Sequence, residues 1–221
     1  MGGPVKKRRY DSSRRRAAAE ARRAAILVAA RELFSTRGYA ETSVAEIAAA
    51  AEVSVDTLYA AVGRKPRLLL AVHDMELAEG DTPLPAEQRG YVRDVRAAGT
   101  AEEKIALYAA ALARVLPRSV PLLEALRVAG RSDAGCRQAY ESVSERRAAN
   151  MRLFAADLRA TGQLRDDLDD DTVADLVWSM NSPDYFQLLR SRGYSPGQYA
   201  ALVQEVWTRT LLHKSRAGQQ N

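Results

Sequence analysis

Residues 37–70 read RGYAETSVAEIAAAAEVSVDTLYAAVGRKPRLLL, and this stretch decides the fold. Ser43 and Glu46 stand three residues apart at the start of an apolar run, which is the capping-box pattern that begins a helix. Ser54 is placed to begin a second short helix in a similar way. Gly63 follows the last apolar residue of that helix, where helices commonly end. The stretch therefore predicts two short helices joined by a tight turn, which is a helix-turn-helix.

A longer helix is predicted ahead of this motif. Ile26, Leu33 and Phe34 are spaced so that they share one face of a helix. Gly38 follows as the C-terminal cap. After the motif, Pro66 suits the first turn of a further helix. The two short helices are thus expected to pack on a longer one.

The second short helix has a small, polar outer side made by Asp56, Thr57, Tyr59 and Ala60. Side chains of this size allow a helix to enter the major groove of DNA and reach base edges. The same pattern also fits an ordinary helical hairpin, so periodicity alone leaves both interpretations open. The basic segment that precedes the motif favours a nucleic-acid partner.

The positive charge of the chain is concentrated near its N-terminus. Of the 33 Lys and Arg and 28 Asp and Glu, residues 1–72 hold 14 and 7, and residues 73–221 hold 19 and 21. We expect residues 1–19 to form a flexible basic arm that attracts a polyanion, because phosphate contacts release condensed counterions. A solvated tail is the alternative. An interfacial membrane helix is disfavoured because the arm lacks an apolar face.

Helical periodicity continues along the rest of the chain. Helices are predicted at about 86–98, 101–116, 121–130, 136–161, 170–190 and 196–214. Breakers such as Pro117 and Pro121 separate these segments, and no strand-like alternation of any length occurs. We therefore expect an all-α protein of about nine or ten helices. It divides into the arm at 1–19, a three-helix helix-turn-helix domain at 20–72 and a C-terminal helical domain at 73–221.

Composition excludes several kinds of site. A single cysteine, Cys136, forms neither an internal disulfide framework nor a cysteine-rich zinc site. Two histidines are too few for a three-histidine metal site. The aspartates within residues 166–171 lack the glycine of a calcium loop, and we interpret them as residues that favour the N-terminus of a helix. We expect no metal and no cofactor.

The sequence also bears on enzymatic activity and on membranes. It contains no phosphate-binding loop and no nucleophile–base grouping, which makes an enzyme the weaker alternative. The longest apolar candidate, residues 105–116, contains Arg114 and is expected to stop at Pro117, so no membrane-spanning helix is predicted. The basic N-terminus has no apolar stretch of a secretory signal behind it. We expect a cytoplasmic protein with no membrane partner.

Residues 37–70 resemble the DNA-binding domain of TetR-type transcriptional regulators. The matching features are Gly38-Tyr39, Thr42-Ser43-Val44, Ile47-Ala48, Val53-Ser54, Thr57-Leu58-Tyr59 and Lys65. With residues 24–34 as the first helix, the resemblance extends over the whole predicted motif. Beyond it, the chain resembles the family in length, helicity and order of elements.

The resemblance implies a set of DNA-contacting residues. Thr42 and Lys65, at the starts of the second and fourth helices, are expected to contact phosphates. Ser54, Thr57 and Tyr59 are expected to contact DNA from the third helix. Hydroxyl groups, helix N-termini and lysine all suit phosphate oxygens. The full candidate set is Thr42, Ser43, Ser54, Val55, Asp56, Thr57, Tyr59, Ala60, Arg64 and Lys65.

Some positions of the motif depart from the family pattern or keep two interpretations. Glu52 stands where the family usually has glycine, and a positive φ there would cost on the order of 1 kcal/mol. Ala61 and Val62 replace residues that are commonly aromatic or histidine, which removes one phosphate contact that Arg64 could supply. Asp56 could accept a hydrogen bond from cytosine or simply favour the helix N-terminus.

For the C-terminal domain, the resemblance implies a dimer interface and a ligand cavity. The candidate dimer residues are Val173, Leu176, Val177, Met180, Leu202, Val203, Val206 and Trp207. Such apolar stripes serve a dimer, an internal core or both, and this choice stays open. The candidate cavity residues are Tyr108, Leu112, Val128, Tyr140, Met151, Phe154, Trp178, Asn181 and Tyr185. Asn181 beside Trp178 is a polar group that could orient a ligand.

The expected function follows from this resemblance. It implies a homodimeric, sequence-specific regulator that binds double-stranded DNA at a palindromic operator and is released by a small-molecule effector. Dimerisation also has an independent reason, because one short recognition helix reads few base pairs. An activator of the same fold is the first alternative. A non-specific architectural DNA-binding protein that uses the basic arm is the second.

Overall fold

The computed structural model describes residues 6–213 and confirms the prediction of an all-α protein, with ten α-helices and one short 3-10 helix in this part of the chain. The N-terminal helices are α1 (Lys6–Arg37), α2 (Val44–Ala50), α3 (Val55–Val62) and α4 (Lys65–Ala78). The middle elements are η1 (Ala86–Gln88), α5 (Gly90–Ala97), α6 (Ala101–Ala129) and α7 (Ala134–Arg159). The last three are α8 (Asp170–Met180), α9 (Pro183–Ser191) and α10 (Pro196–Leu211).

The predicted helix-turn-helix is present in α2 and α3. Ser43 begins α2 through a complete capping box: its hydroxyl accepts from the Glu46 N–H at 3.2 Å, and the Glu46 carboxylate accepts from the Ser43 N–H at 2.8 Å. The Ser54 hydroxyl begins α3 by accepting from the Thr57 N–H at 3.1 Å. Leu58 of α3 is fully buried in a core shared with α1, α2 and α4. The short helices therefore owe their ends to caps and their position to burial.

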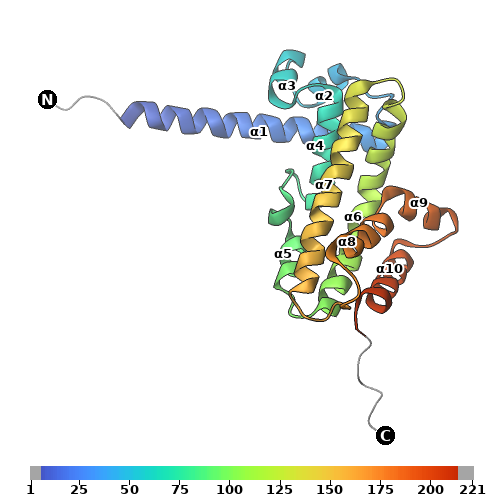
Figure 1. The fold of residues 1–221 in the computed structure, drawn as a ribbon. Coiled ribbons are helices and arrows are strands. Elements are labelled where there is room, and N and C mark those ends of the chain that lie inside the picture. The colour runs from blue at the N-terminus through green and yellow to red at the C-terminus, as the bar shows by residue number, and fades with distance from the viewer. Residues whose placement is uncertain (1–5, 214–221) are drawn as a thin grey trace, which may run out of the picture.

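Two long helices, α6 and α7, pack against each other and form the centre of the C-terminal part (Figure 1). Helix α8 packs on α7, while α5 and α10 pack on α6. The core of the N-terminal helices also includes Leu122 and Leu126 of α6 and Val143 of α7. The four N-terminal helices are thus held to the rest of the protein by shared apolar burial.

Helix α1 is longer than the sequence analysis predicted. The expected flexible arm at 1–19 is instead helical from Lys6 onward, and residues 1–5 lie outside the described part of the chain. Figure 1 shows the N-terminal half of α1 extending away from the other helices. Residues 12–22 are exposed, so the helix here rests on local preference. Alanine and arginine, which are frequent in this segment, are both strong helix formers.

Helix α6 passes through both prolines that were expected to interrupt it. Pro117 and Pro121 lie inside one continuous helix, in place of the two predicted at 101–116 and 121–130. Both prolines are exposed and four residues apart, so the carbonyl groups that lose a hydrogen bond lie on one outer face. Burial of the opposite face, including Leu116 and Val120, offsets this loss.

The continuity of α6 also corrects the expectation about membrane-spanning length. By length and composition, residues 101–129 form a stretch apolar enough to cross a membrane, the one such helix among the described residues. Half of its most apolar window is buried inside the protein. Its Lys104 is buried and forms an ion pair with Asp157 at 3.0 Å. Helix α6 is therefore the central core helix of this fold.

Other helix limits differ from the predictions by shorter distances. The segment expected at 170–190 is divided into α8 and α9, because the Ser182 hydroxyl caps a new helix that starts at Pro183. The segment at 86–98 contains η1 before α5. The expected domain limit between residues 72 and 73 falls inside α4, which is a single helix.

The turn between α2 and α3 contains a strained residue. Glu52 has φ +55°, the left-handed conformation that glycine adopts at lower cost. The anticipated conflict between glutamate and this turn is therefore present. Glu79, at the end of α4, has a similar φ of +53°, but its carboxylate forms an ion pair with Arg114 at 3.0 Å. Glu52 has no comparable ion pair among the described residues.

We expect Glu52→Gly to raise the free energy of unfolding by about 0.5–1 kcal/mol, because glycine removes the Cβ clash at positive φ. Urea unfolding followed by circular dichroism measures this change. Ala49→Gly in neighbouring α2 is the matched control, and it should lower stability by about 1 kcal/mol. Destabilisation of the same size by both changes would contradict the strain at Glu52.

Candidate nucleic-acid interface and ligand cavity

Helix α3 presents a small outer face that matches the predicted DNA-contacting side. Tyr59 is 45% exposed, and Asp56 and Ala60 are exposed beside it. Thr57 is half-buried, and its hydroxyl lies 2.8 Å from the Ser54 hydroxyl. The face therefore combines one projecting phenol with small groups and two hydroxyls near a helix N-terminus. These are groups that fit a DNA groove and its phosphates.

The remaining candidates at this interface fall into two groups. Ser43 and Arg64 are exposed at the N-caps of α2 and α4, and Val55 is half-buried at the start of α3. Thr42 requires a correction, because only 1% of it is exposed. Its hydroxyl donates to the carbonyl oxygen of Gly38 at 2.8 Å. The Thr42 side chain thus fixes the connection between α1 and α2, and it is not available to a phosphate.

Lys65 lies at the first position of α4, next to the recognition helix. Its Nζ sits 4.1 Å from the centroid of the Tyr39 ring, a cation–π contact that holds the side chain in place. Burial lowers the pKa of Lys65, and the nearby carboxylates of Glu41 and Glu46 act in the opposite direction. The Tyr39 hydroxyl lies 3.2 Å from Sγ of Cys136 in α7. Tyr39 therefore connects the DNA-binding part to the C-terminal helices.

Three arginines tie the second half of α4 to the long helices. Arg146 of α7 contacts both carboxylate oxygens of Asp74, at 3.0 and 3.2 Å. Arg118 of α6 reaches Glu76 at 3.1 Å, and Arg114 contacts Glu79 in the same region. Planar guanidinium groups that pair with carboxylates in two places fix orientation as well as distance. The position of α4 is therefore set by α6 and α7.

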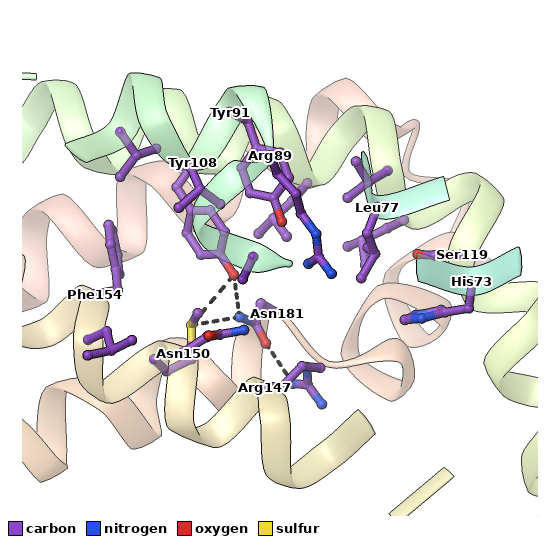
Figure 2. A pocket seen from close by; sticks show the side chains of 18 of the residues that line it. His73, Leu77, Arg89, Tyr91, Tyr108, Ser119, Arg147, Asn150, Phe154 and Asn181 are labelled. Atoms are coloured by element: carbon purple, nitrogen blue, oxygen red, sulfur yellow. Dashed lines mark hydrogen bonds between the residues drawn. The ribbon is translucent and has the colours of Figure 1, made fainter. Parts of the chain in front are cut away.

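A cavity of about 130 Å³ lies among α4, α5, α6 and α7 (Figure 2). Five of the predicted ligand residues line it: Tyr108, Leu112, Met151, Phe154 and Asn181. Most of the wall is apolar or aromatic, and a few polar groups interrupt it. This composition is typical of small-molecule sites.

The polar part of the wall is a connected network. Arg147 Nη2 donates to Asn181 Oδ1 at 2.6 Å, and Asn181 Nδ2 donates to the Tyr108 hydroxyl at 2.7 Å. Asn181 Nδ2 and the Tyr108 hydroxyl also donate to Sδ of Met151, at 3.0 and 3.5 Å. Figure 2 shows these groups converging from different helices. The network fixes the rotamers at one end of the cavity.

Four predicted cavity residues lie elsewhere. Val128 is 50% exposed on the outer side of α6, and Tyr140 packs against the N-terminal core. The Trp178 ring lies beneath the Arg147 guanidinium, 5.2 Å from it, and Tyr185 packs against Tyr199. These positions were proposed from helical periodicity, which does not specify the neighbouring helix that a face meets.

Several lining residues were missed by the sequence analysis. They include Arg89, Ser119 and Arg147. A polar residue on an otherwise apolar helix face was the available signal for Ser119. Nothing in the sequence distinguished Arg89 and Arg147 from the other arginines.

Comparisons with known proteins agree with this geometry. Residues 26–72 match the family described as bacterial regulatory proteins, tetR family. The match begins inside α1 and extends through α2 and α3 to Val72 of α4, so this segment carries the sequence pattern of that family. No curated protein sequence matches the chain significantly.

Solved structures share the fold of this chain at low sequence identity. A protein described as a transcriptional regulator from Saccharomonospora viridis, in complex with choline, is 20% identical with a TM-score of 0.66; the match covers 88% of this chain and 99% of that one. NalD of Pseudomonas aeruginosa, described as the secondary repressor of a multidrug efflux pump, is 21% identical with a TM-score of 0.61 and the same coverage. SmeT in complex with triclosan is 17% identical with a TM-score of 0.63, over 88% and 93%.

The residues expected at a dimer interface separate into two sets. Val173, Val177, Val203 and Trp207 are fully buried within the protomer, so they form internal core and not an interface. By contrast, Leu176 of α8 is 39% exposed. Met180, Leu202 and Val206 are half-buried. The internal-core interpretation therefore holds for four of these positions.

The aspartates at residues 166–171 act locally. The Asp169 carboxylate accepts from the Thr172 N–H at 2.7 Å and caps α8. Asp167 and Asp170 form ion pairs with Arg165 and Arg159. Among the residues that the structure describes, no cluster of histidine, cysteine, aspartate or glutamate could hold a metal ion.

His73 in the cavity wall makes stability depend on pH. It is buried, and its Nδ1 lies 3.4 Å from Asp74 Oδ1 without an aligned hydrogen bond. Burial lowers the pKa of His73, assisted by Arg146 and Arg89 and opposed by Asp74. The folded state therefore keeps the imidazole neutral where the unfolded chain, with a pKa of about 6.5, takes up a proton. Stability from this source is complete above about pH 6.5 and decreases as the pH falls below it.

Between about pH 7 and pH 5.5, the free energy of unfolding should fall less steeply in His73→Gln than in the wild type. The substitution removes a group that binds a proton more tightly in the unfolded chain than in the folded one. Urea unfolding at several pH values measures the slope. Ser119→Ala, at a residue of the same cavity wall that does not titrate, is the control and should retain the wild-type slope. Equal slopes in wild type and His73→Gln would refute this role.

Proposed function

We propose that this chain is a homodimeric, sequence-specific DNA-binding regulator of the TetR family whose affinity for its operator is lowered by a small-molecule ligand. The observation that carries the proposal is the position of α4. This helix begins with Lys65 beside the recognition helix, and its residues His73 and Leu77 line the cavity. A DNA-contacting face and a ligand cavity therefore share one rigid element.

At the DNA, α3 would enter the major groove with Tyr59, Asp56 and Ala60 toward the bases and backbone. The hydroxyls of Ser54 and Thr57 and the Lys65 ammonium group would contact phosphates on either side. The excess of basic residues in 1–72 supports this by attracting DNA before specific contacts form.

A homodimer would give this face enough sequence to read. Two recognition helices spaced about 34–36 Å apart fit successive major grooves of a palindromic operator. The exposed apolar side chains Leu176 of α8 and Leu188 of α9, 39% and 60% exposed, support an interface near the last helices. Leu202 and Val206 of α10 are half-buried and accessible to a partner.

The coupling between ligand and DNA would act through α4. A ligand in the cavity contacts the α4 wall, while ion pairs to Arg114, Arg118 and Arg146 resist movement of that helix. If the ligand binds more tightly to a state with displaced α4, it shifts the population toward that state, and the ratio of its affinities for the two states limits how far operator binding falls. We assign a repressor because NalD, which shares the fold, is described as one. Its place of action is the cytoplasm, where the DNA is.

We expect Tyr59→Phe and Lys65→Met to weaken operator binding by about tenfold or more each, because a hydrogen bond to a charged phosphate contributes about 1.5–3 kcal/mol. Methionine keeps the packing of Lys65 on Tyr39 and removes only the charge. Fluorescence anisotropy with operator DNA selected from a random pool measures binding.

Arg93→Ala removes an exposed positive charge from α5, away from the proposed face, and serves as the control. It should bind as the wild type does. Circular dichroism and sedimentation test whether each variant stays folded and keeps its oligomeric state. Unchanged DNA affinity in both Tyr59→Phe and Lys65→Met would contradict the assignment of this face as the one that contacts DNA.

Deletion of residues 1–19 should lower affinity for all DNA sequences and flatten the dependence of log K on log salt. The segment contains seven lysines and arginines, and each phosphate contact contributes a slope of about −0.9. Operator and random DNA, titrated at several salt concentrations, measure both effects. An unaltered slope would mean that the segment does not contact DNA.

Equal affinity of the full chain for operator and random DNA would favour the architectural alternative.

A further inference from the structure

The charged groups of the cavity wall are mainly positive. Arg89, Arg96 and Arg147 line it, against the single carboxylate of Asp157. Asp157 is already neutralised by Lys104, whose Nζ lies 3.0 Å from it. The cavity therefore carries an excess of positive charge inside a largely apolar wall, where an uncompensated charge is costly.

Arg89 is buried with spare hydrogen-bonding capacity. Only 6% of the residue is exposed, and Nε donates to the carbonyl oxygen of Leu84 at 3.2 Å. Its nearest carboxylate in the described chain is Asp74, at 3.8 Å from Nη2. That carboxylate is occupied by the closer, two-point contact with Arg146. The Arg89 guanidinium thus has no closely paired anion and can donate to one.

Arg147 approaches the same cavity from α7. Its Nη2 donates to two neutral oxygens, the Trp178 carbonyl and Asn181 Oδ1, each at 2.6 Å. The guanidinium also lies over the Trp178 ring. Within residues 6–213, no carboxylate pairs with it at ion-pair distance. An arginine side chain remains charged even when burial disfavours the cation, so a second positive charge stays uncompensated here.

Figure 2 shows Arg89 and Arg147 on two sides of the drawn space, with Arg147 next to Asn181. The phenol of Tyr108 and the ring of Phe154, with centroids 5.0 Å apart, form an aromatic section of the wall. At the far end, buried Ser119 has an unpartnered hydroxyl. The volume of about 130 Å³ is close to that of cavities that hold one benzene-sized molecule.

We infer that the cavity binds a monocarboxylic acid of about the size of one aromatic ring, with its carboxylate between Arg89 and Arg147 and its apolar part against Tyr108 and Phe154. That the acid binds is argued from the cavity alone. That its binding lowers affinity for DNA rests on the proposed function. Guanidinium groups recognise carboxylates through paired charge-assisted hydrogen bonds. The cations of this cavity disfavour a quaternary ammonium ligand such as the choline held by the regulator from Saccharomonospora viridis.

The test compares probes of equal size and different charge on the full chain without DNA. Benzoate, phenylacetate and hexanoate are the acids, benzamide is the neutral analogue of benzoate, and benzylamine is the cation. Isothermal titration calorimetry and thermal unfolding measure binding, since a ligand that binds only the folded state raises the melting temperature. We expect at least one acid to bind about tenfold or more tightly than benzamide, and benzylamine not to bind. Failure of all three acids to bind, or binding of benzamide or benzylamine as tight as that of the acids, would overturn the inference.

Variants then identify the carboxylate partners. Arg89→Gln and Arg147→Gln should each weaken binding of the acid by about tenfold or more, with little effect on any binding of benzamide. Arg93→Gln, on the exposed side of α5, should leave it unchanged. Because Arg147 also supports Asn181, Arg147→Lys keeps the charge without the planar fork and gives a second measurement at that position. Retention of full acid affinity by both glutamine variants would refute the assigned partners.

Operator binding in the presence of the same probes separates the two proposals. An acid that binds the cavity without changing DNA affinity would support the inference about the ligand and contradict ligand-controlled release. A neutral or cationic compound that binds the cavity and releases DNA, while the acids do not bind, would support ligand-controlled release and overturn the inference.

Discussion

The structure depends on the continuity of α4. A helix of 14 residues spans about 20 Å, so Lys65 at its start and Leu77 near its end belong to different surroundings on one rigid rod. Leu68 and Leu69 of the first half lie in the N-terminal core, and α1 packs against this helix. The second half carries two carboxylates, and the C-cap Glu79 a third, that pair with arginines of α6 and α7; two residues of this half also lie in the cavity wall. Displacement of either half therefore involves the other.

The cavity is shaped by the same pair of long helices that positions α4. Helix α6 contributes Tyr108 and Leu112 and α7 contributes Arg147 and Met151, while α4 and α5 close the remaining sides. Within this wall Arg147 has no carboxylate at ion-pair distance and Arg89 reaches one only at 3.8 Å, so both guanidinium groups need hydrogen bonds and nearby polar groups to replace part of their hydration. A bound anion would complete that replacement, which links the chemistry of the ligand to the stability of the folded state.

Local sequence patterns identified the helix-turn-helix correctly because its signals are short-range. The capping box of Ser43 and Glu46 and the cap at Ser54 act within three or four residues, so the chain encodes them without help from distant segments. The left-handed turn at Glu52 was expected instead from the resemblance to the family, because glutamate itself does not favour that conformation. By contrast, Pro117 and Pro121 are strong local breakers, and only the burial of the opposite face of α6 against other helices allows the helix to pass through them.

The candidate cavity shows the limit of such patterns. Periodicity places Tyr108, Leu112, Met151, Phe154 and Asn181 on inward faces, and all five line the cavity, but it places Val128, Tyr140, Trp178 and Tyr185 equally well. It also does not separate a dimer stripe from an internal one, and Val173, Val177, Val203 and Trp207 are internal. The sequence by itself determined the all-α class, the capped short helices and the basic N-terminal part. The tertiary structure alone decided how closely each cavity arginine approaches a carboxylate and which inward faces enclose space, because both depend on neighbours that are distant along the chain.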